Sequence, residues 1–237
     1  MDIAGSIIDI AAGCASTGMI LVMHCCGIIA IRDHMKGPAR DEILTKAASG
    51  QHLSTLAFSE HGTGANFGAT FTMSEPDADR YKLNGEKCFV TSGGHADSYV
   101  LTARAPGAKE VTTSTIYVVS KNNDGIAFHG AWNGVGLRGN SSVGMKLSNC
   151  TVDGAAVLGT PGEGLSLAMS TVLPLFLLGS ASVYHGIARA TFDACCNHVK
   201  SRTHTHNSES LSNIPNVRRA IAQMKIKLDS SRAMIEG

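Results

Sequence analysis

The sequence contains few charged and few aromatic side chains. Charged residues make up 16% and aromatic residues 5% of its 237 residues, and the formal net charge is +1. A protein that binds nucleic acid through its phosphates carries a basic run or patch, and none occurs here. The 43% of hydrophobic residues is far above what disordered chains contain. The composition therefore excludes a nucleic-acid partner and a mainly disordered chain, and it predicts a folded core.

Proline is scarce, and the cysteines form no recognisable framework. Six prolines stand against 26 glycines, which favours tight turns over a proline-rich linker. The seven cysteines are an odd number without a CxxC motif, and two adjacent pairs, Cys25-Cys26 and Cys195-Cys196, are among them. Such a set fits neither a disulfide framework nor a zinc site. We therefore expect reduced thiols in a cytoplasmic protein.

Residues 10–31 form one long apolar run near the N-terminus. The run is as long as a membrane-spanning helix, and His24 and two thiols are its only ionisable side chains. Many of its residues are small or weakly polar, which suits a helix buried on all sides inside a bundle. We prefer the buried helix to a membrane span. Asp2 does not fit the basic start of a signal peptide, and a helix starting almost at Met1 suggests that the natural protein begins upstream.

The order of patterns along the chain predicts an α+β fold. Residues 1–52 are predicted to be helical, 53–162 a central antiparallel β-domain (a barrel or sandwich), and 163–237 a C-terminal helical zone. The last zone should hold a helix from 164 to about 202 with a kink at Pro174, and a second helix starting at Pro215.

Turn-forming residues divide the central zone into strands. Asn84-Gly85 lies between β-forming residues, which predicts a hairpin over 81–90 with a type I′ turn. Further strands are predicted at 99–104, 115–120, 126–132 and 143–147, separated by glycine- and asparagine-rich turns.

Several motifs resemble catalytic or binding sites only in part. Residues 134–139 match GxGxxG, but a turn and a strand follow where a dinucleotide site needs a helix. The glycine-rich residues 61–66 lack the lysine of a phosphate-binding loop. Ser92, His95 and Asp97 have hydrolase chemistry without a GxSxG elbow. The cluster of Cys195, Cys196, His198, His204 and His206 does not have zinc spacing, so no metal site is predicted.

Four segments in this order resemble the acyl-CoA dehydrogenase family of flavoproteins. They include Phe-Ser-Glu-His-Gly-Thr-Gly at 58–64 and Asn-Gly-Glu-Lys at 84–87 with Phe-Val-Thr at 89–91, and they occupy residues 56–66, 83–97, 132–142 and 158–169. The resemblance covers residues from about 40 to 235. It implies helices, a β-domain and helices in that order, and an FAD cofactor between the β-domain and the C-terminal helices.

The resemblance also implies which residues contact FAD. Phe58 and Ser59 correspond to positions near the flavin ring edge, and Phe89 supplies a flat apolar wall. Thr91 can hydrogen-bond near flavin N5, and Arg202 corresponds to an arginine that reaches the FAD pyrophosphate of a neighbouring subunit. The complete predicted set is Leu56, Phe58, Ser59, Ala65, Phe89, Val90, Thr91, Arg202 and His204.

The family reaction is the α,β-dehydrogenation of an acyl thioester, with hydride transfer to flavin N5. The resemblance places the glutamate base beyond residue 237, so we expect this chain to be a fragment without a catalytic residue of its own. The implied partners are an acyl thioester of CoA or of a carrier protein, and a second copy in a homodimer or homotetramer. The electron acceptor stays open.

Some positions depart from the family pattern. Ala65-Asn66 replaces Ser-Asp, Phe89 replaces the commoner Trp, and residues 171–178 are apolar where the family carries an Asp and an Arg. These changes favour an unusual or bulky acyl substrate. A flavin-dependent monooxygenase on the same fold, and a non-catalytic or truncated family member, stay open as alternatives.

Overall fold

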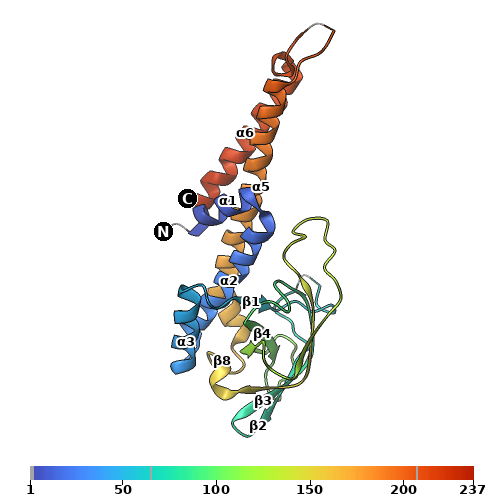
Figure 1. The fold of residues 1–237 in the computed structure, drawn as a ribbon. Helices are drawn as coiled ribbons and strands as arrows, with labels where there is room; N and C mark the ends of the chain where they lie inside the picture. Colours follow the sequence, from blue (N-terminus) through green and yellow to red (C-terminus); the bar gives the residue numbers. More distant parts are fainter. Residues whose placement is uncertain (1–2, 65, 207) are drawn as a thin grey trace. The chain divides into compact units, whose positions relative to one another are not determined.

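The computed structural model describes residues 3–64, 66–206 and 208–237 (Figure 1). It divides into two compact units, residues 20–176 and residues 1–19 with 177–237. Each unit is described by itself below. The predicted domain boundaries after residues 52 and 162 both fall inside the larger unit, and they stay a prediction.

The larger unit is built around one sheet, as the predicted β-domain requires. The sheet order is β6-β7-β3-β2-β4-β5-β8, and β1 pairs with β4. Most neighbours are antiparallel, but β1 and β2 each pair with β4 in parallel. The strands are β1 (Ser54–Ala57), β2 (Met73–Asp77), β3 (Arg80–Val90), β4 (Ser98–Arg104), β5 (Ser114–Ser120), β6 (Ile126–His129), β7 (Val143–Asp153) and β8 (Val157–Leu158).

The core of this unit lies on the inner faces of the strands. Tyr99 and Leu101 of β4 and Tyr117 and Val119 of β5 are completely buried and alternate along their strands. The rings of Tyr81 and Tyr117 meet edge to face with centroids 5.4 Å apart. The strands predicted at 99–104 and 115–120 are therefore confirmed. The strand at 126 ends at His129 instead of residue 132, and the strand at 143 continues to Asp153.

The predicted hairpin turn at Asn84-Gly85 is wrong. β3 runs without a break from Arg80 to Val90, and the turn lies at Ala78-Asp79, where Asp77 pairs with Arg80. Asn84 lies at a register shift, and its side chain accepts a hydrogen bond from the Asn149 amide at 2.7 Å. A Cβ at Gly85 would lie 2.7 Å from the Thr72 Cα, so glycine is needed for close packing rather than for a turn.

Helices cover part of the sheet in the larger unit. The C-terminal part of α2 (Ala15–His34) buries Val22, Cys26 and Ala30 on one face. Gly27 lets this helix approach β1, because a Cβ there would lie 2.6 Å from the Ser54 hydroxyl. Outside the strands this unit also contains α3 (Pro38–Ala48), short helices at Gly154–Ala156 and Gly164–Leu167 (α4), and a π-helical turn at Ala168–Val172.

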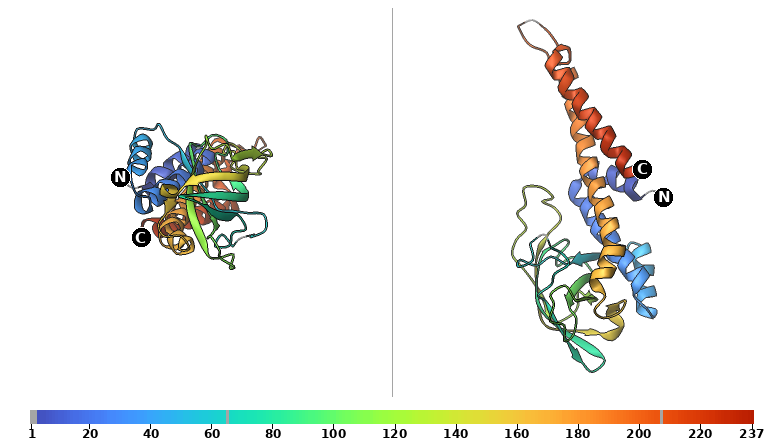
Figure 2. Two further views of the ribbon diagram at one scale, coloured as in Figure 1. Left: turned by 90° about the horizontal axis from the view of Figure 1, so that it is seen from below. Right: turned by 180° about the vertical axis from the view of Figure 1, so that it is seen from behind.

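The smaller unit is helical. α1 (Ile3–Gly13), α5 (Leu173–Ser201, from residue 177 onward) and α6 (Pro215–Glu236) form it, with a short 3₁₀ turn at Leu211–Asn213. α5 and α6 run side by side in opposite directions (Figure 2). His185 of α5 and Ser231 of α6 form a hydrogen bond of 2.8 Å, and Arg189 of α5 pairs with Asp9 of α1 at 2.8 Å. The predicted helices at 164–202 and from Pro215 are confirmed, and the irregularity is a π-turn just before Pro174.

Replacing Gly186 with leucine is expected to destabilise the helical unit by about 3 kcal/mol, because a side chain there overpacks a helix crossing. A Cβ at Gly186 would lie 2.5 Å from the Ile8 carbonyl oxygen and 2.8 Å from the Ala11 Cβ. The free energy of unfolding, measured in urea, checks this. Ala188→Leu is the control on the exposed side of the same helix, and an equal loss in both variants would contradict the prediction.

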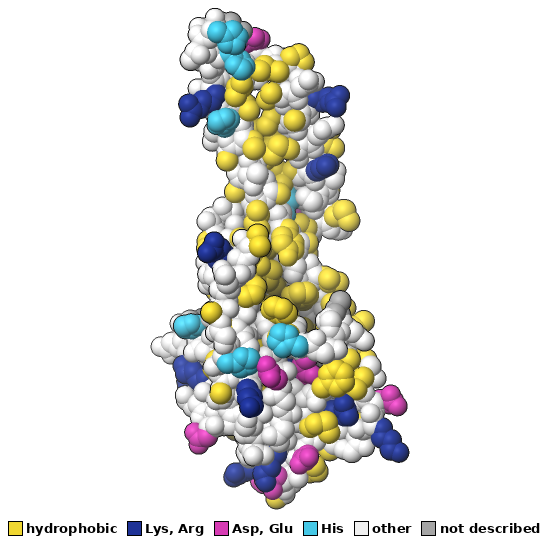
Figure 3. All heavy atoms as spheres, turned by 90° about the vertical axis from the view of Figure 1, so that its right-hand side faces the viewer, with side chains coloured by type: hydrophobic (Ala, Val, Ile, Leu, Met, Phe, Trp, Pro, Cys, Tyr) yellow, Lys and Arg dark blue, Asp and Glu magenta, His cyan; other side chains and the backbone are white. Residues whose placement is uncertain are grey.

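Apolar side chains remain at the surface of several helices. Two stretches, Ala15–His34 and Gly164–Ser201, are long and apolar enough to cross a membrane by length and composition alone. A helix in the core of a folded protein passes the same test, and α2 buries part of its surface. On α5 and α6 apolar side chains stay exposed (Figure 3), namely Leu177, Tyr184, Ile226 and Met234. The absence of a membrane partner stays a prediction.

Candidate functional site

An apolar cavity of about 260 Å³ lies in the larger unit. It is formed by the end of β1 and the segment after it, by β3, and by the helical residues around the π-turn. Its lining contains no charged side chain and is Met23, Leu56, Phe58, Ser59, Gly64, Phe67, Cys88, Phe89, Val172, Leu173 and Phe176. Such a cavity suits a flat or aliphatic group that needs few polar contacts.

The cavity joins two sequence segments that were predicted to face one group. The Cys88 amide donates a hydrogen bond of 2.8 Å to the Ser59 carbonyl oxygen. This bond holds the chain after β1 against the end of β3, so Ser59 and Phe89 line the same cavity. Leu56, Phe58, Ser59 and Phe89 of the predicted cofactor set are thereby brought together. Whether they contact FAD stays a prediction.

Phe89 has an unusual backbone for a bulky residue. Its φ angle is 55°, in the region that favours glycine, and the register between β3 and β7 shifts at this point. Its side chain is 60% exposed, although the neighbours Cys88 and Val90 are buried. The bulge turns the Phe89 ring outward, where it meets the Trp132 ring edge to face at 6.3 Å. Strained positions of this kind gather at functional sites.

The next two residues of the predicted set lie deeper. The Val90 side chain is completely buried in the core of the sheet, so Val90 can contribute to a cofactor site only through its backbone. Thr91 is buried, and its hydroxyl forms a hydrogen bond of 3.1 Å with the Ser142 hydroxyl. Neither residue belongs to the lining of the cavity.

The remaining three residues of the predicted set are Ala65, Arg202 and His204. Ala65 falls outside the described residues. Arg202 and His204 belong to the smaller unit and follow the end of α5, where Thr203 forms a β-bridge with Ser210. Arg202 is exposed. The structure does not test the predicted contact of Arg202 with the cofactor of a neighbouring subunit.

A buried ion pair beside the cavity was not predicted from the sequence. The Lys87 ammonium lies 2.5 Å from the Glu60 carboxylate, and both side chains are buried. Burial raises the pKa of Glu60, but the charge and hydrogen bond of Lys87 and the hydroxyls of two threonines outweigh this effect and lower the pKa to about 2. Burial lowers the pKa of Lys87 to about 8, against the opposing effect of Glu60. The sequence offered one sign of this ion pair, a lysine between β-forming residues together with threonines at positions 70, 72 and 102.

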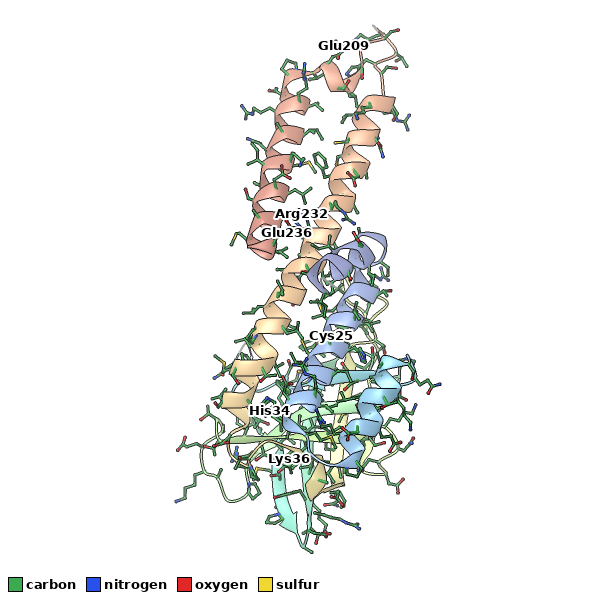
Figure 4. All side chains as sticks on the ribbon, turned by 90° about the vertical axis from the view of Figure 1, so that its left-hand side faces the viewer. Cys25, His34, Lys36, Glu209, Arg232 and Glu236 are labelled. Carbon is green, nitrogen blue, oxygen red and sulfur yellow. The ribbon has the colours of Figure 1, made fainter. Side chains whose placement is uncertain are left out.

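The helical residues that line the cavity were not predicted from the sequence either. Val172 and Leu173 lie at the π-turn, and Phe176 lies one turn further along α5. The Thr171 hydroxyl of this turn forms a hydrogen bond of 2.8 Å with His34 at the end of α2, which Figure 4 labels. π-turns often occur at functional sites because they change which side chains a helix presents.

The other motifs serve the fold. Asp97 accepts a hydrogen bond from the Leu53 amide and pairs with Lys121, so it does not orient His95. The glycine motif at 134–139 is followed by β7 and not by a helix, in agreement with the sequence interpretation. Among the described residues, no group of three or more His, Cys, Asp or Glu side chains is placed to hold a metal ion.

A larger cleft of about 470 Å³ lies between α3 and the β4–β5 region. Its charged side chains already pair with one another, Lys46 with Glu42 and Lys121 with Asp97. His52 in this cleft hydrogen-bonds to Ser98 at 2.8 Å. The smaller cavity is the better candidate site because a strained aromatic residue and an uncommitted apolar lining meet there.

Known proteins match this chain over most of its length. Residues 55–150 match the family model of the acyl-CoA dehydrogenase middle domain. The chain is 27% identical over 227 residues to the mitochondrial short-chain specific acyl-CoA dehydrogenase of Rattus norvegicus, covering 95% of this chain and 54% of that protein. The chain therefore spans about half the length of this curated relative.

Solved structures show the same fold. Butyryl-CoA dehydrogenase from Megasphaera elsdenii matches with a TM-score of 0.91 at 21% identity, over 97% of this chain and 60% of that one. A structure described as an FAD-dependent dehydrogenase matches with a TM-score of 0.89 at 25% identity, over 99% of this chain and 64% of the other. The predicted fold class, with helices on both sides of a central β-domain in the chain order, is confirmed.

Proposed function

We propose that this chain, whose residues 55–150 match the family model of the acyl-CoA dehydrogenase middle domain, binds FAD. We further propose that the protein containing it dehydrogenates an acyl thioester between the α and β carbons. The observation that carries the proposal is the cavity that Ser59 and Phe89 both line. The same two segments carry the family resemblance in the sequence.

The residues around the cavity fit a flavin ring. Phe89 offers a flat apolar surface that is 60% exposed before any ligand covers it. Leu56, Phe58 and Leu173 supply apolar walls, and Ser59 supplies a hydroxyl at the rim. The volume of about 260 Å³ suits a ring system rather than a whole dinucleotide, so the remainder of FAD would extend outside this cavity.

Bound FAD would supply the hydride acceptor that the amino acid side chains lack. Phe89 would hold the plane of the ring, and the apolar lining would exclude water from the reacting carbons. Ser59 would donate a hydrogen bond to a polar edge of the ring, and charge that develops there would be stabilised by such fixed donors. These roles come from the chain's own side chains.

Glu60 does not act as the base that removes the α-proton, although it is next to Ser59. Its carboxylate is buried, pairs with Lys87 and has a pKa lowered to about 2. A general base works best with a pKa near the working pH. Glu60 is therefore not proposed as the base, in agreement with the family resemblance, which assigns the base to none of the residues of this chain.

Reconstitution with FAD tests the proposed function. The purified chain is mixed with FAD, and the quenching of flavin fluorescence and the visible absorbance of the protein fraction after gel filtration are measured. We expect a yellow protein that retains FAD. A colourless chain that leaves FAD fluorescence unchanged at all protein concentrations would overturn the proposal.

Replacing Phe89 with alanine is expected to weaken FAD binding about tenfold, because a stacked aromatic contact contributes about 1–2 kcal/mol with its buried area. The side chain is exposed, so the free energy of unfolding should change by less than about 0.5 kcal/mol. A fluorescence titration and urea unfolding measure the two effects. Phe89→Trp is the matched control and should keep the affinity; equal weakening in both variants would contradict the role of the ring.

We extend the proposal to the substrate, the assembly and the location of the protein. The apolar stretch of residues 171–178 supports an acyl group without charge near the thioester. We also propose a homodimer or homotetramer, supported by the family resemblance, and a cytoplasmic location, supported by the seven free thiols. Sedimentation velocity tests the assembly, and recovery of the protein in the membrane fraction of lysed cells would contradict the location.

A further inference from the structure

A buried ion pair lies directly behind the walls of the cavity. Glu60 follows the cavity residue Ser59, and Lys87 precedes Cys88 and Phe89. Lys87 is completely buried and Glu60 is 5% exposed. Removing two charges from water costs free energy that their attraction often only balances. A buried pair of this kind therefore contributes to the arrangement of the chain more than to its net stability.

Every polar atom of the pair has a partner. Glu60 accepts hydrogen bonds from Lys87 at 2.5 Å, from both the hydroxyl (2.7 Å) and the amide (3.2 Å) of Thr72, from the Phe71 amide (2.6 Å) and from the Thr70 hydroxyl (2.7 Å). The Lys87 ammonium also reaches the Thr70 and Thr102 hydroxyls at 3.3 and 3.2 Å. A carboxylate only accepts and an ammonium only donates, so a neutral amide in place of the Glu60 carboxylate cannot reproduce this set.

The partners of Glu60 close a loop. The chain leaves β1 after Ala57 and enters β2 at Met73, and the Glu60 carboxylate binds residues 70–72 just before β2. The loop at 61–69 contributes Gly64 and Phe67 to the cavity. The glycine at position 62 packs under Phe71, because a Cβ there would lie 2.9 Å from its ring. Glu60 thus fixes both ends of a segment that lines the cavity.

Lys87 connects this loop to the sheet. It lies on β3, two residues before Phe89, and bonds to Thr102 of β4 as well as to Glu60. The backbone bond from Cys88 to Ser59 runs beside it at 2.8 Å. The strained backbone of Phe89 follows at once, and such a conformation persists only where its surroundings fix it.

Taking the proposed flavin site as its premise, we propose that Glu60 and Lys87 are positioning residues for the cavity. Their ion pair closes the loop at 61–69 and holds Ser59, Gly64 and Phe89 around the space that the cofactor would enter. The pair is net neutral, so it fixes the walls without adding charge to the cavity. Neither residue belongs to the cavity lining.

Two variants of different severity test the proposal. Glu60→Gln removes the charge and turns an amide NH₂ toward groups that can only donate, such as the Phe71 amide. Thr72→Val keeps the ion pair and removes one hydroxyl that donates to Glu60. Tyr117→Phe is the matched control, because it removes a buried hydroxyl bond to Ser74 and does not touch the cavity lining.

The affinity for FAD and the hydrogen exchange of the Phe71 and Cys88 amides are measured in each variant, with circular dichroism to confirm folding. We expect FAD binding about tenfold weaker or more in Glu60→Gln, since displaced contact groups lose most of their effect. Thr72→Val should weaken binding a few-fold, and both amides should exchange faster in Glu60→Gln. Tyr117→Phe should change neither.

Three results decide against the proposal. Unchanged FAD affinity in folded Glu60→Gln overturns it, and so does an equal loss in Tyr117→Phe. If Glu60→Gln does not fold, unchanged affinity and exchange in Thr72→Val overturn it. A wild-type chain that binds no FAD overturns the proposed function separately. In that case, the hydrogen exchange of the Phe71 and Cys88 amides in Glu60→Gln alone tests whether the ion pair fixes the segments that line the cavity.

Discussion

Replacing Lys87 with methionine is expected to lower the free energy of unfolding by about 3–5 kcal/mol, because it leaves the buried Glu60 charge without its partner. Methionine fills a similar volume, so the loss comes from the charge and not from a cavity. The ammonium also satisfies the Thr102 hydroxyl, which loses its donor. Urea unfolding followed by far-UV circular dichroism measures the change.

Lys82→Met is the matched control for this prediction. Lys82 lies on the same strand and pairs with Asp77 at 3.0 Å. The two side chains are 43% and 45% exposed. Exposed pairs contribute at most about 1 kcal/mol, so the same substitution there should have a small effect. Similar losses in both variants would show that the Glu60–Lys87 pair has no special importance for stability.

Acidification from pH 4.5 to pH 2 is expected to remove about 3 kcal/mol of stability through Glu60 alone, at about 1.4 kcal/mol for each pH unit between its two pKa values. The pKa of Glu60 falls from 4.5 to about 2 on folding. The folded state therefore holds the ionised form while the unfolded state takes up a proton. The stabilisation is complete above pH 4.5 and is lost as the pH falls toward 2.

The difference between wild type and Glu60→Gln isolates this effect from other carboxyl groups. The free energy of unfolding is measured in urea for both proteins at intervals from pH 5 to pH 2.5. The wild type should lose more stability than the variant, and the gap between them should narrow as the pH falls. Parallel curves would contradict the pKa of Glu60 and the ionised state of the pair.

Local sequence patterns predicted most of the secondary structure. Turn-forming residues on either side placed the strands at Tyr99 and Thr115, and proline at Pro215 marked the start of α6. The prediction failed at Asn84-Gly85, where a favourable turn sequence lies inside a long strand. Pairing with β7 on one side and the approach of Thr72 on the other outweighed the local preference for a turn.

The candidate site was predicted only in part. Leu56, Phe58, Ser59 and Phe89 came from the family resemblance, and the cavity contains all four. Met23, Phe67 and the side chains of the π-turn were not predicted, because they come from segments far apart in sequence. Val90 belongs to the predicted cofactor set, and strand alternation after the bulge turns its side chain into the core, so its contact with a cofactor stays a prediction for the backbone alone.

By itself, the sequence determined the fold class, the resemblance of the middle zone to a known family and the two segments that meet at the cavity, because periodicity and motifs are local properties of the chain. Only the tertiary structure decided that Lys87 is buried against Glu60 and that the Glu60 carboxylate binds residues 70–72. A buried lysine and an exposed one are the same letter in a sequence. The difference is made by what the rest of the chain brings within hydrogen-bonding distance of the ammonium, here two threonine hydroxyls and a carboxylate.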